Sequence, residues 1–309
     1  MPTISVIMSV HNAGRFLAPA VESILNQTFR DLDFIIIDDG STDASRELLE
    51  RFAKRDQRVK LICQENQGLT ASLNCAIALA KSDLLARMDA DDLALPDRLG
   101  IQVRYMQQHP EVVLLGGAYE LIDEAGRALT VLTPPQDDAT LQEHCLSGRT
   151  PICHPLAMMR SDAVRNVGGY DPQLTVAQDL DLWLKLGEIG KLACVSDVLL
   201  RYRQHEHSVS EKKQRLQVQN MKLACERAYQ RRGIQREFLG EGGWRPSSHR
   251  SSRHEFALRY GWWAFNNAHR RTAAIYGLKA ISALPWDSRG WKLLVCAALK
   301  PVKVSRADA

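Results

Sequence analysis

The chain lacks the signals that mark several common classes of protein. No run of about 18 or more apolar residues occurs, so we expect no transmembrane helix. The first residues, Met1–Val6, carry no basic stretch of the kind that begins a signal peptide. The seven cysteines are scattered and form no C-x-x-C pair, which argues against a zinc site or a disulfide framework. These absences favour a cytoplasmic protein in a reducing compartment.

The two common glycine-rich phosphate-binding loops are missing as well. Neither G-x-G-x-x-G nor G-x-x-x-x-G-K-[ST] follows the first apolar segment, so a dinucleotide-binding fold or a P-loop is poorly supported. Acidic residues stand where such glycines would be expected. The densest group is Asp89, Asp91 and Asp92, directly after the apolar segment Leu84–Met88.

The net charge of +4 conceals an uneven distribution along the chain. Residues 1–200 carry 18 Lys/Arg and 28 Asp/Glu, a balance of −10, whereas residues 201–309 carry 22 and 8, a balance of +14. One explanation is two ordinary charged surfaces. The other is a basic C-terminal region that faces anionic lipid or another anionic partner.

Short apolar segments alternate with helical patterns in the first half of the chain. Apolar residues fill Ile4–Val10, Phe34–Ile37, Val59–Cys63 and Leu84–Met88, whereas Leu69–Leu79 has helical periodicity. Continuously apolar strands separated by helices predict an α/β fold with a mostly parallel sheet covered on both faces. Ligands bind to such sheets beyond the carboxyl ends of the strands.

Polar residues follow three of these predicted strands, and we expect them to converge. They are Asn12, Asp38, Asp39, Asp89, Asp91 and Asp92. Clustered carboxylates repel one another unless a cation joins them, and oxygen ligands suit Mg²⁺ or Mn²⁺. The pattern therefore predicts a divalent cation and a phosphate-bearing substrate. Asp43 is assigned to a turn, and Ser41 or Thr42 to the cap of the following helix.

Four segments resemble glycosyltransferase family 2 and occur in the order expected for that family. They are Ser5–Asn12, Ser23–Phe29, Ile36–Asp43 and Arg87–Asp92. The resemblance extends over residues 3–210. It implies the GT-A fold of nucleotide-diphospho-sugar transferases, with a Rossmann-like sheet, and an enzyme that inverts the configuration of the transferred sugar.

The resemblance also implies roles for residues on the donor side. Ser9 and Asp39 would lie at the nucleobase, and Asp89, Asp91 and Asp92 would form the D-x-D element on ribose and metal. The donor-binding set also includes Asn12, together with Asn66 and Gly68, which match the family's N-x-G. The candidate metal ligands are Asp91, which we favour for direct contact, Asp92 and His205.

Three positions depart from the family pattern. Ser72-Leu73-Asn74 stands where the family often has Ala-Arg-Asn, which puts a basic contact to the diphosphate in doubt. His11 replaces a usual Tyr, so base stacking is expected to differ. Gln178 replaces the Glu that precedes the catalytic Asp.

On the acceptor side, Gly168–Asp171 resembles the family's GG[YF]D turn, with Gly169 and Tyr170 as candidate acceptor-side residues. The resemblance assigns Asp179 as the general base, which must take the proton of the acceptor hydroxyl as that oxygen attacks the anomeric carbon. Asp181 is assigned a structural role.

Two histidines have open interpretations. His205 fits the family's Tyr-Arg-x-His segment as a third metal ligand, but an ordinary surface histidine is an equal alternative. His154 precedes the predicted strand Leu156–Met159 and either faces the acceptor pocket or is structural.

The last hundred residues are basic and mainly helical. We assign residues 1–210 to a catalytic domain and residues 211–309 to a helical appendage with a flexible segment at residues 233–252. The predicted helices are Ser210–Arg232, Phe256–Ala268, Arg271–Leu284 and Trp291–Leu299, with Tyr260, Trp262, Trp263 and Phe265 in the packing. This region either packs on the catalytic domain or lies on an anionic membrane through a Trp-bearing face.

Two functions remain open. The first is a metal-dependent inverting glycosyltransferase that moves a hexosyl or N-acetylhexosaminyl group, with UDP the favoured donor nucleotide. Its acceptor would be a hydroxyl of a glycan or lipid-linked molecule in surface polysaccharide assembly, at the inner face of the cell membrane. The second is a nucleotide-sugar-binding or nucleotidyltransferase-like protein without sugar transfer, which leaves Asp179 unexplained. A processive synthase is disfavoured because Q-x-x-R-W is missing, and no nucleic-acid partner is expected.

Overall fold

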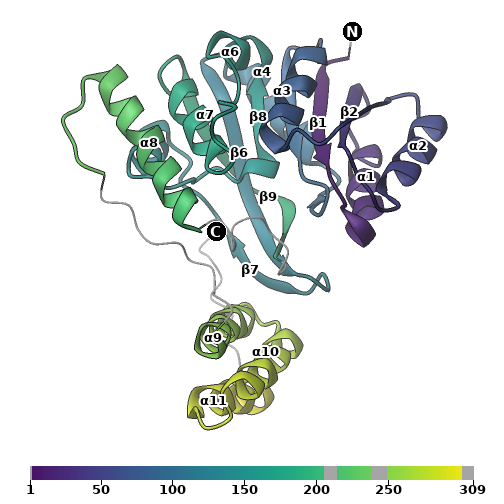
Figure 1. The fold of residues 1–309 in the computed structure, drawn as a ribbon. Helices are drawn as coiled ribbons and strands as arrows, with labels where there is room; N and C mark the ends of the chain where they lie inside the picture. Colours follow the sequence, from purple (N-terminus) through teal and green to yellow (C-terminus); the bar gives the residue numbers. More distant parts are fainter. Residues whose placement is uncertain (1, 205–213, 239–248, 301–309) are drawn as a thin grey trace. The chain divides into compact units, whose positions relative to one another are not determined.

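The computed structural model describes residues 2–204, 214–238 and 249–300. The chain divides into two compact units, whose elements are labelled in Figure 1. Unit 1 comprises Met1–Tyr119, Thr133–Tyr202 and Arg215–Glu241, and unit 2 comprises Glu120–Leu132, Arg203–Gln214 and Gly242–Ala309. The boundary predicted after residue 210 lies outside the described residues.

A nine-stranded mixed sheet forms the framework of the protein. Its order is β3-β2-β1-β4-β8-β6-β9-β5, with β7 paired to β6. The strands are β1 (Ile4–Val10), β2 (Leu32–Asp39), β3 (Val59–Gln64), β4 (Leu84–Met88), β5 (Leu93–Ala94), β6 (Val112–Asp123), β7 (Ala128–Leu132), β8 (Met158–Arg160) and β9 (Lys191–Gln204). The four strands predicted from the apolar segments are confirmed and run parallel, whereas β8 runs antiparallel to both β4 and β6.

The register of the parallel strands brings their carboxyl ends level. Met8 of β1 lies opposite Ile36 of β2 on one side and Met88 of β4 on the other. The chain leaves all three strands within a few residues of this row. Polar residues far apart in the sequence therefore reach one edge of the sheet, as the α/β pattern predicts.

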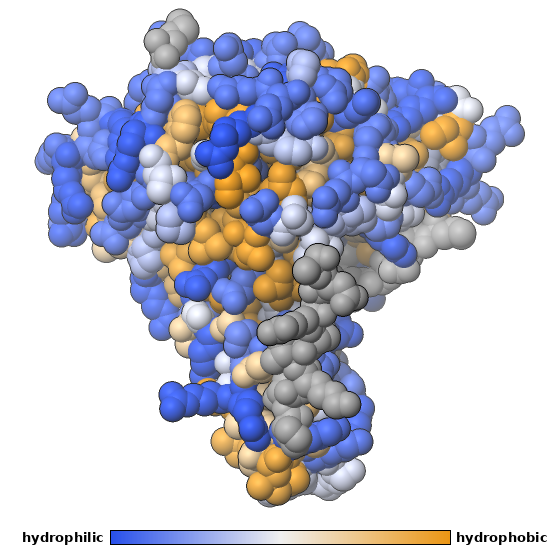
Figure 2. Space-filling model, turned by 180° about the vertical axis from the view of Figure 1, so that it is seen from behind, coloured by the Kyte–Doolittle hydropathy of each residue, from blue (hydrophilic) through white to orange (hydrophobic). Residues whose placement is uncertain are grey.

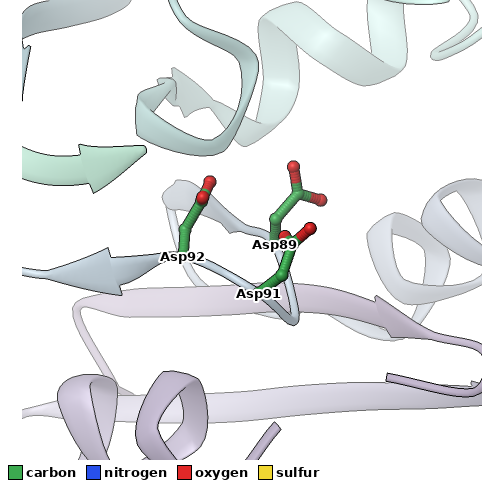
Figure 3. Close-up of side chains that lie close together, drawn as sticks. All are labelled: Asp89, Asp91 and Asp92. Carbon is green, nitrogen blue, oxygen red and sulfur yellow. The ribbon is translucent and has the colours of Figure 1, made fainter. Parts of the chain in front are cut away.

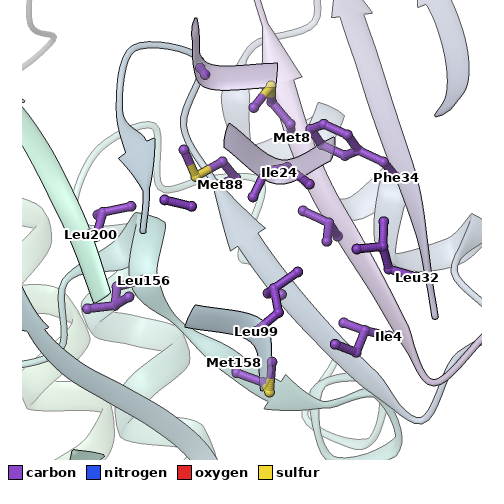
Figure 4. Packing of buried hydrophobic residues seen from close by; sticks show 14 of the residues in the cluster. Ile4, Met8, Ile24, Leu32, Phe34, Met88, Leu99, Leu156, Met158 and Leu200 are labelled. Atoms are coloured by element: carbon purple, nitrogen blue, oxygen red, sulfur yellow. The ribbon is translucent and has the colours of Figure 1, made fainter. Parts of the chain in front are cut away.

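Side chains alternate between two hydrophobic cores, one on each face of the sheet. In β2, Phe34 and Ile36 join one core, whereas Ile35 and Ile37 join the other, because successive residues of a strand point to opposite faces. Figure 4 shows the first core, where residues of β1, β2 and β4 pack with Ile24 and Leu99. This packing on both faces explains why the strands are continuously apolar.

Helices cover both faces of the sheet in unit 1. The first core receives α1 (Leu17–Leu25), α2 (Ser45–Arg55), α4 (Arg98–Gln108) and η2 (His154–Leu156). The short helix η1 (Gly14–Phe16) precedes α1 and buries no residue. The second core receives α3 (Leu69–Leu79), α5 (Asp138–Leu146), α6 (Ser161–Asn166), α7 (Gln178–Leu186) and α8 (Gln214–Arg232). The prediction of α3 is confirmed to the residue.

The predicted cap of α2 is wrong. The helix begins at Ser45, and its N-cap residue, Ala44, makes no side-chain cap. The hydroxyl of Ser41 instead accepts a hydrogen bond from the Asn12 N–H at 3.1 Å, so Ser41 joins two strand ends. Asp43 is a turn residue as predicted, and its carboxylate accepts from the Ser45 N–H at 2.9 Å.

In unit 2, the structure describes three helices that pack through small and aromatic residues. They are α9 (Arg250–Asn266), α10 (Arg270–Ala283) and α11 (Ser288–Leu299), which confirms the three helices predicted in this region. The rings of Tyr260 and Tyr276 meet edge to face, with 5.6 Å between centroids. Gly261 lies against Leu293, where a Cβ atom would come within 2.3 Å of a leucine methyl. Among the described residues, no helix has the length and apolar character needed to cross a membrane.

The loop between β3 and α3 depends on one carboxylate of β2. Asp39 is 2% exposed and accepts hydrogen bonds from the N–H groups of Gln67 and Gly68, both at 2.9 Å, and from the Gln64 side-chain amide at 2.8 Å. Burial by itself would raise the pKa of Asp39, but these hydrogen bonds outweigh it, and the pKa is lowered. Gly68 needs its glycine because its φ is +90°.

We expect Asp39→Asn to destabilise unit 1 by about 2 kcal/mol at neutral pH, because an amide nitrogen cannot accept the third hydrogen bond. Since the folded-state pKa is lowered, this contribution is present above the unfolded-state pKa near 3.9 and disappears as the pH falls through the folded-state value. Urea unfolding of both proteins between neutral and acidic pH measures it. The control is Asp197→Asn, an exposed carboxylate on β9. An equal loss in the control, or a difference that persists in acid, would contradict the prediction.

Candidate functional site

Three carboxylates meet in the turn between β4 and β5. One oxygen each from Asp89, Asp91 and Asp92 lies within 4.8 Å of the others. Figure 3 shows the three side chains rising from the same side of this turn. Asp92 is fully buried, and the other two are partly exposed. The cluster predicted from the sequence is therefore assembled in the fold.

The residues present fit a divalent cation. All three side chains offer oxygen ligands, which is the donor set that Mg²⁺ and Mn²⁺ prefer. The Arg87 guanidinium pairs with Asp89. Burial raises the pKa of Asp89, Arg87 opposes this effect, and the like charge of Asp91 adds to it. A bound cation would offset that repulsion and favour the ionised form.

A buried arginine of α4 holds the end of β4. Arg98 is 0% exposed and donates from Nη2 to the carbonyl oxygen of Arg87 at 2.7 Å and from Nε to Gln102 at 3.1 Å. Gln102 in turn donates to the Leu156 carbonyl oxygen at 2.8 Å. Burial lowers the pKa of Arg98 to about 9. Sequence reasoning missed this residue, although an arginine among the apolar positions of a helix was the available signal.

The predicted nucleotide-side residues lie at the carboxyl ends of β1 and β2 and in the loop before α3. Asn12 has a positive φ of +52°, and its Oδ1 accepts from the N–H groups of Thr42 and Asp43 at 2.8 and 3.2 Å. Asn66 places its amide nitrogen 3.0 Å from His11 Nδ1. Ser9 lies near the end of β1, opposite Ile37. Asn12 and Asp39 thus already hold loops together at this edge.

Leu73, which stands where the family often has an arginine, is part of the hydrophobic core. Leu73 is 0% exposed and packs in the second core with Ile35 and Ala76. A basic side chain at this position would lose that packing. The departure from the family pattern is therefore matched by an apolar environment on α3.

Asn74, the next residue of α3, holds the GG[YF]D turn through two hydrogen bonds. Asn74 accepts from the Tyr170 N–H at 3.0 Å and donates to the Tyr170 carbonyl oxygen at 2.8 Å. A Cβ atom on Gly169 would come within 2.8 Å of Asn74 Oδ1, so only glycine fits there. Tyr170 is 0% exposed, and its hydroxyl lies 2.7 Å from His154 Nε2. Burial holds the pKa of His154 well below its usual value, so this imidazole is neutral.

Asp179 lies in the first turn of α7, where the helix dipole favours negative charge. Its Oδ1 accepts from the Leu180 N–H at 2.9 Å. Burial raises the pKa of Asp179, whereas the Leu180 hydrogen bond and the Arg87 cation oppose the rise. Ala177, the N-cap residue of α7, has a left-handed φ of +57°, a strained conformation of the kind found at functional sites. Asp179 is partly exposed, as a proton acceptor for a substrate must be.

Asp181 and His205 have different outcomes. Asp181 is buried and pairs with Lys185 at 2.6 Å, which agrees with a structural role. His205 lies outside the described residues, so its assignment as a metal ligand stays a prediction.

A hollow of about 410 Å³ opens at the other end of the parallel strands. It contains none of the predicted site residues, and its lining is Pro2, Thr3, Lys81, Ser82, Asp83, Leu84, Met106, Gln107 and Arg160. The candidate site is instead the edge where the acidic turn, the nucleotide-side loops and the first turn of α7 meet.

Comparisons with known proteins agree with this arrangement. The family model described as Glycosyl transferase family 2 matches residues 5–168 of the chain. A putative glycosyltransferase, EpsE of Bacillus subtilis, is 35% identical over 193 residues, which are 61% of this chain and 68% of the relative. The O-antigen biosynthesis glycosyltransferase WbnJ of Escherichia coli is 33% identical over 213 residues, 67% of this chain and 82% of the relative.

Two solved structures share the fold at low sequence identity. TarS residues 1–349 of S. aureus, in complex with UDP-GlcNAc, has a TM-score of 0.56 and 15% identity, covering 95% of this chain and 79% of that one. The mannosyltransferase PcManGT of Pyrobaculum calidifontis, in complex with GDP-Man and Mn²⁺, has a TM-score of 0.56 and 16% identity, with coverage of 96% and 80%. With its GT-A fold, its strand-end carboxylates and these matches, the chain belongs to glycosyl transferase family 2.

Proposed function

We propose that the protein is an inverting glycosyltransferase that moves a hexosyl or N-acetylhexosaminyl group from a nucleotide-diphosphate sugar to a hydroxyl of a glycan or lipid-linked acceptor. The observation that carries this proposal is the meeting of the acidic turn with Asp179 at one sheet edge. WbnJ is named for O-antigen biosynthesis, which supports a role in surface polysaccharide assembly. TarS binds UDP-GlcNAc and PcManGT binds GDP-Man, which supports a nucleotide-sugar donor.

We propose UDP as the donor nucleotide, with Asp39 contacting the base. The family resemblance implies this role for Asp39, and the UDP-GlcNAc complex of TarS supports the choice of UDP.

Asp91 and Asp92 would hold a Mn²⁺ or Mg²⁺ ion, with Asp89 on the ribose. Such an ion supplies positive charge that stabilises the leaving diphosphate. His205 is a further candidate ligand.

Asp179 would accept the proton of the acceptor hydroxyl. The hydroxyl oxygen forms the new bond to the anomeric carbon, its proton passes to an Asp179 carboxylate oxygen, and the sugar–phosphate bond breaks with its electron pair on the diphosphate. Attack opposite the leaving group inverts the anomeric configuration. The raised pKa of Asp179 makes it a better proton acceptor than an ordinary carboxylate.

Unit 2 carries features that suit contact with an anionic membrane. Residues 249–300 contain nine Lys/Arg and two Asp/Glu, a balance of 9 − 2 = +7. Trp291, Val295 and Leu299 are spaced four residues apart on α11, and their exposures are 51%, 54% and 78%. Trp286, just before the helix, is 78% exposed. Figure 2 shows hydrophobic and hydrophilic residues side by side on this part of the surface. We propose peripheral binding at the cytoplasmic face, where basic residues and tryptophan both favour the interface.

A thermal-shift screen tests the donor and the metal. We expect UDP with Mn²⁺ to raise the melting temperature by roughly 5–10 °C when UDP is at about 100 times its Kd, and GDP to raise it less. Asp91→Asn should lose the metal-dependent part of the rise, because it removes a ligand. Asp97→Asn, an exposed carboxylate before α4, is the matched control and should keep it. Equal shifts with and without metal in the unchanged protein would refute the metal site.

Asp179→Asn tests the base. We expect UDP release from UDP-glucose, UDP-galactose or UDP-N-acetylglucosamine to fall by roughly 10²–10⁴-fold, with the UDP–Mn²⁺ thermal shift retained. Asp162→Asn is a matched control, because Asp162 also lies in the first turn of a helix and accepts from the next N–H, at 2.7 Å. Turnover that survives in Asp179→Asn would show that another group is the base. Binding without turnover in the unchanged protein would favour a nucleotide-sugar-binding function.

Flotation with vesicles tests the membrane contact. We expect salt-sensitive binding to vesicles that contain phosphatidylglycerol and none to pure phosphatidylcholine. The triple change Trp286→Ser, Trp291→Ser and Leu299→Ser should abolish binding by removing the exposed apolar stripe. A control with Leu79→Ser and Ile189→Ser, exposed 45% and 51% in unit 1, should bind normally. Loss of binding in both variants, or in neither, would contradict the assignment to unit 2.

A further inference from the structure

A short loop, residues 172–177, leads from the GG[YF]D turn into α7, whose first turn carries Asp179. We call it the α7 entry loop. Its backbone forms neither helix nor strand, yet Leu174, Val176 and Ala177 are only 1%, 7% and 7% exposed, whereas most loops run over the surface. Because a buried carbonyl oxygen needs a partner, the side chains that donate to this loop determine its path.

Two buried side chains from different helices donate to the α7 entry loop. Thr70 of α3 donates from Oγ1 to the Leu174 carbonyl oxygen at 3.0 Å, although the two residues are 104 positions apart in the sequence. Asn220 of α8 donates from Nδ2 to the Val176 carbonyl oxygen, also at 3.0 Å. Thr70 is 5% exposed and Asn220 is 8% exposed. These contacts fix the loop directly before Ala177, the left-handed N-cap residue of α7.

The residue type at position 70 agrees with a role for the hydroxyl group. Threonine is a weak helix former, and a buried helix position is normally apolar. A threonine hydroxyl in a helix often bonds to a carbonyl oxygen of its own preceding turn, but that of Thr70 reaches the α7 entry loop instead. The hydroxyl therefore serves a contact between distant segments.

The first turn of α3 is also held from the donor side. Its N-cap residue, Gly68, donates its N–H to the Asp39 carboxylate at 2.9 Å, and Thr70 follows two residues later. Asp39 is the residue proposed to contact the nucleobase. One helical turn thus lies between that carboxylate and the loop that leads to Asp179.

We propose that Thr70 and Asn220 are positioning residues for sugar transfer: they hold the α7 entry loop by its carbonyl oxygens, so that α7 presents Asp179 to the acceptor hydroxyl. Neither side chain touches the reacting atoms. Proton transfer requires the carboxylate and the hydroxyl to lie within hydrogen-bond reach, and a misplacement of about 1 Å can cost about 100-fold in rate. The inference rests on the proposed function, with Asp179 as the base.

Thr70→Val and Asn220→Leu remove one donor each and nearly preserve the size of the side chain. We expect each variant to lower kcat by about 10–100-fold, measured as UDP release from UDP-glucose, UDP-galactose or UDP-N-acetylglucosamine, because Asp179 is no longer held in place. The KM for the donor should stay within about twofold, since neither side chain belongs to the donor site. If one variant does not fold, the other carries the test.

Two further variants separate positioning from stability. Thr70→Ser keeps the hydroxyl and should restore kcat to within about threefold of the unchanged protein. Ser161→Ala is the matched control, because Ser161 is 2% exposed and donates from Oγ to the Ser82 carbonyl oxygen at 2.5 Å, away from the candidate site. It should lower the melting temperature about as much as Thr70→Val and leave kcat unchanged.

Amide hydrogen exchange of residues 173–180, followed by mass spectrometry, tests the loop without turnover. Exchange should become about tenfold faster in Thr70→Val and Asn220→Leu, and stay unchanged in Thr70→Ser and Ser161→Ala. Unchanged exchange in the first two variants, faster exchange with kcat retained, or an equal loss of kcat in Ser161→Ala would overturn the inference. If the unchanged protein releases no UDP from any donor, the proposed function fails, whereas the exchange rates still decide whether Thr70 and Asn220 hold the loop.

Discussion

The parallel register of β1, β2 and β4 is the constraint on which the site depends. Met8 lies level with Ile36 and Met88, so the chain leaves three strands at one edge of the sheet. Asn12 and Asp89 are far apart in the sequence, but both lie at this edge. The two hydrophobic cores fix this register, because a shift by one residue would exchange the buried side chains of the two faces.

Gathering carboxylates at one edge creates an electrostatic problem that the fold solves in three ways. The negative charge of Asp39 is stabilised by hydrogen bonds from two backbone N–H groups and from the Gln64 side-chain amide. Asp38 pairs with Arg46 at 2.7 Å. In the acidic turn after β4, Asp89 pairs with Arg87. The carboxylates of Asp89, Asp91 and Asp92 lie close enough together to share one cation.

Much of this arrangement could be predicted from the sequence, for identifiable reasons. The segments Ile4–Val10 and Leu84–Met88 are buried on both faces and are apolar throughout, so pattern alone identified them as strands. The bounds predicted for the strand at Leu156–Met159 were wrong, because Leu156 ends the short helix η2 and β8 is Met158–Arg160. A strand of three residues is too short to show a period. The cap of α2 was mispredicted because Ser41 and Thr42 are engaged by Asn12, a contact across 29 to 30 residues that local reasoning does not see.

The supporting residues were the least predictable part of the site. Arg87 and Arg98 are charged residues in buried positions, where sequence rules expect apolar side chains. In the sequence, Asn74 stands out only as the last residue of a motif that departs from the family pattern. In the structure, its side chain binds both the N–H and the carbonyl oxygen of Tyr170. Such roles depend on contacts between distant segments, and composition and periodicity contain no information about those contacts.

The packing of α8 determines which segments of the chain must stay together when parts are exchanged between related proteins. Asn220 donates to the Val176 carbonyl oxygen at 3.0 Å, next to the strained Ala177, and Arg227 pairs with Asp171 of the GG[YF]D turn at 2.7 Å. The segment that presents Asp179 is thus braced by a helix that begins well after β9. Recombination or engineered fusion that exchanges the C-terminal portion would preserve this bracing only if the junction falls beyond α8.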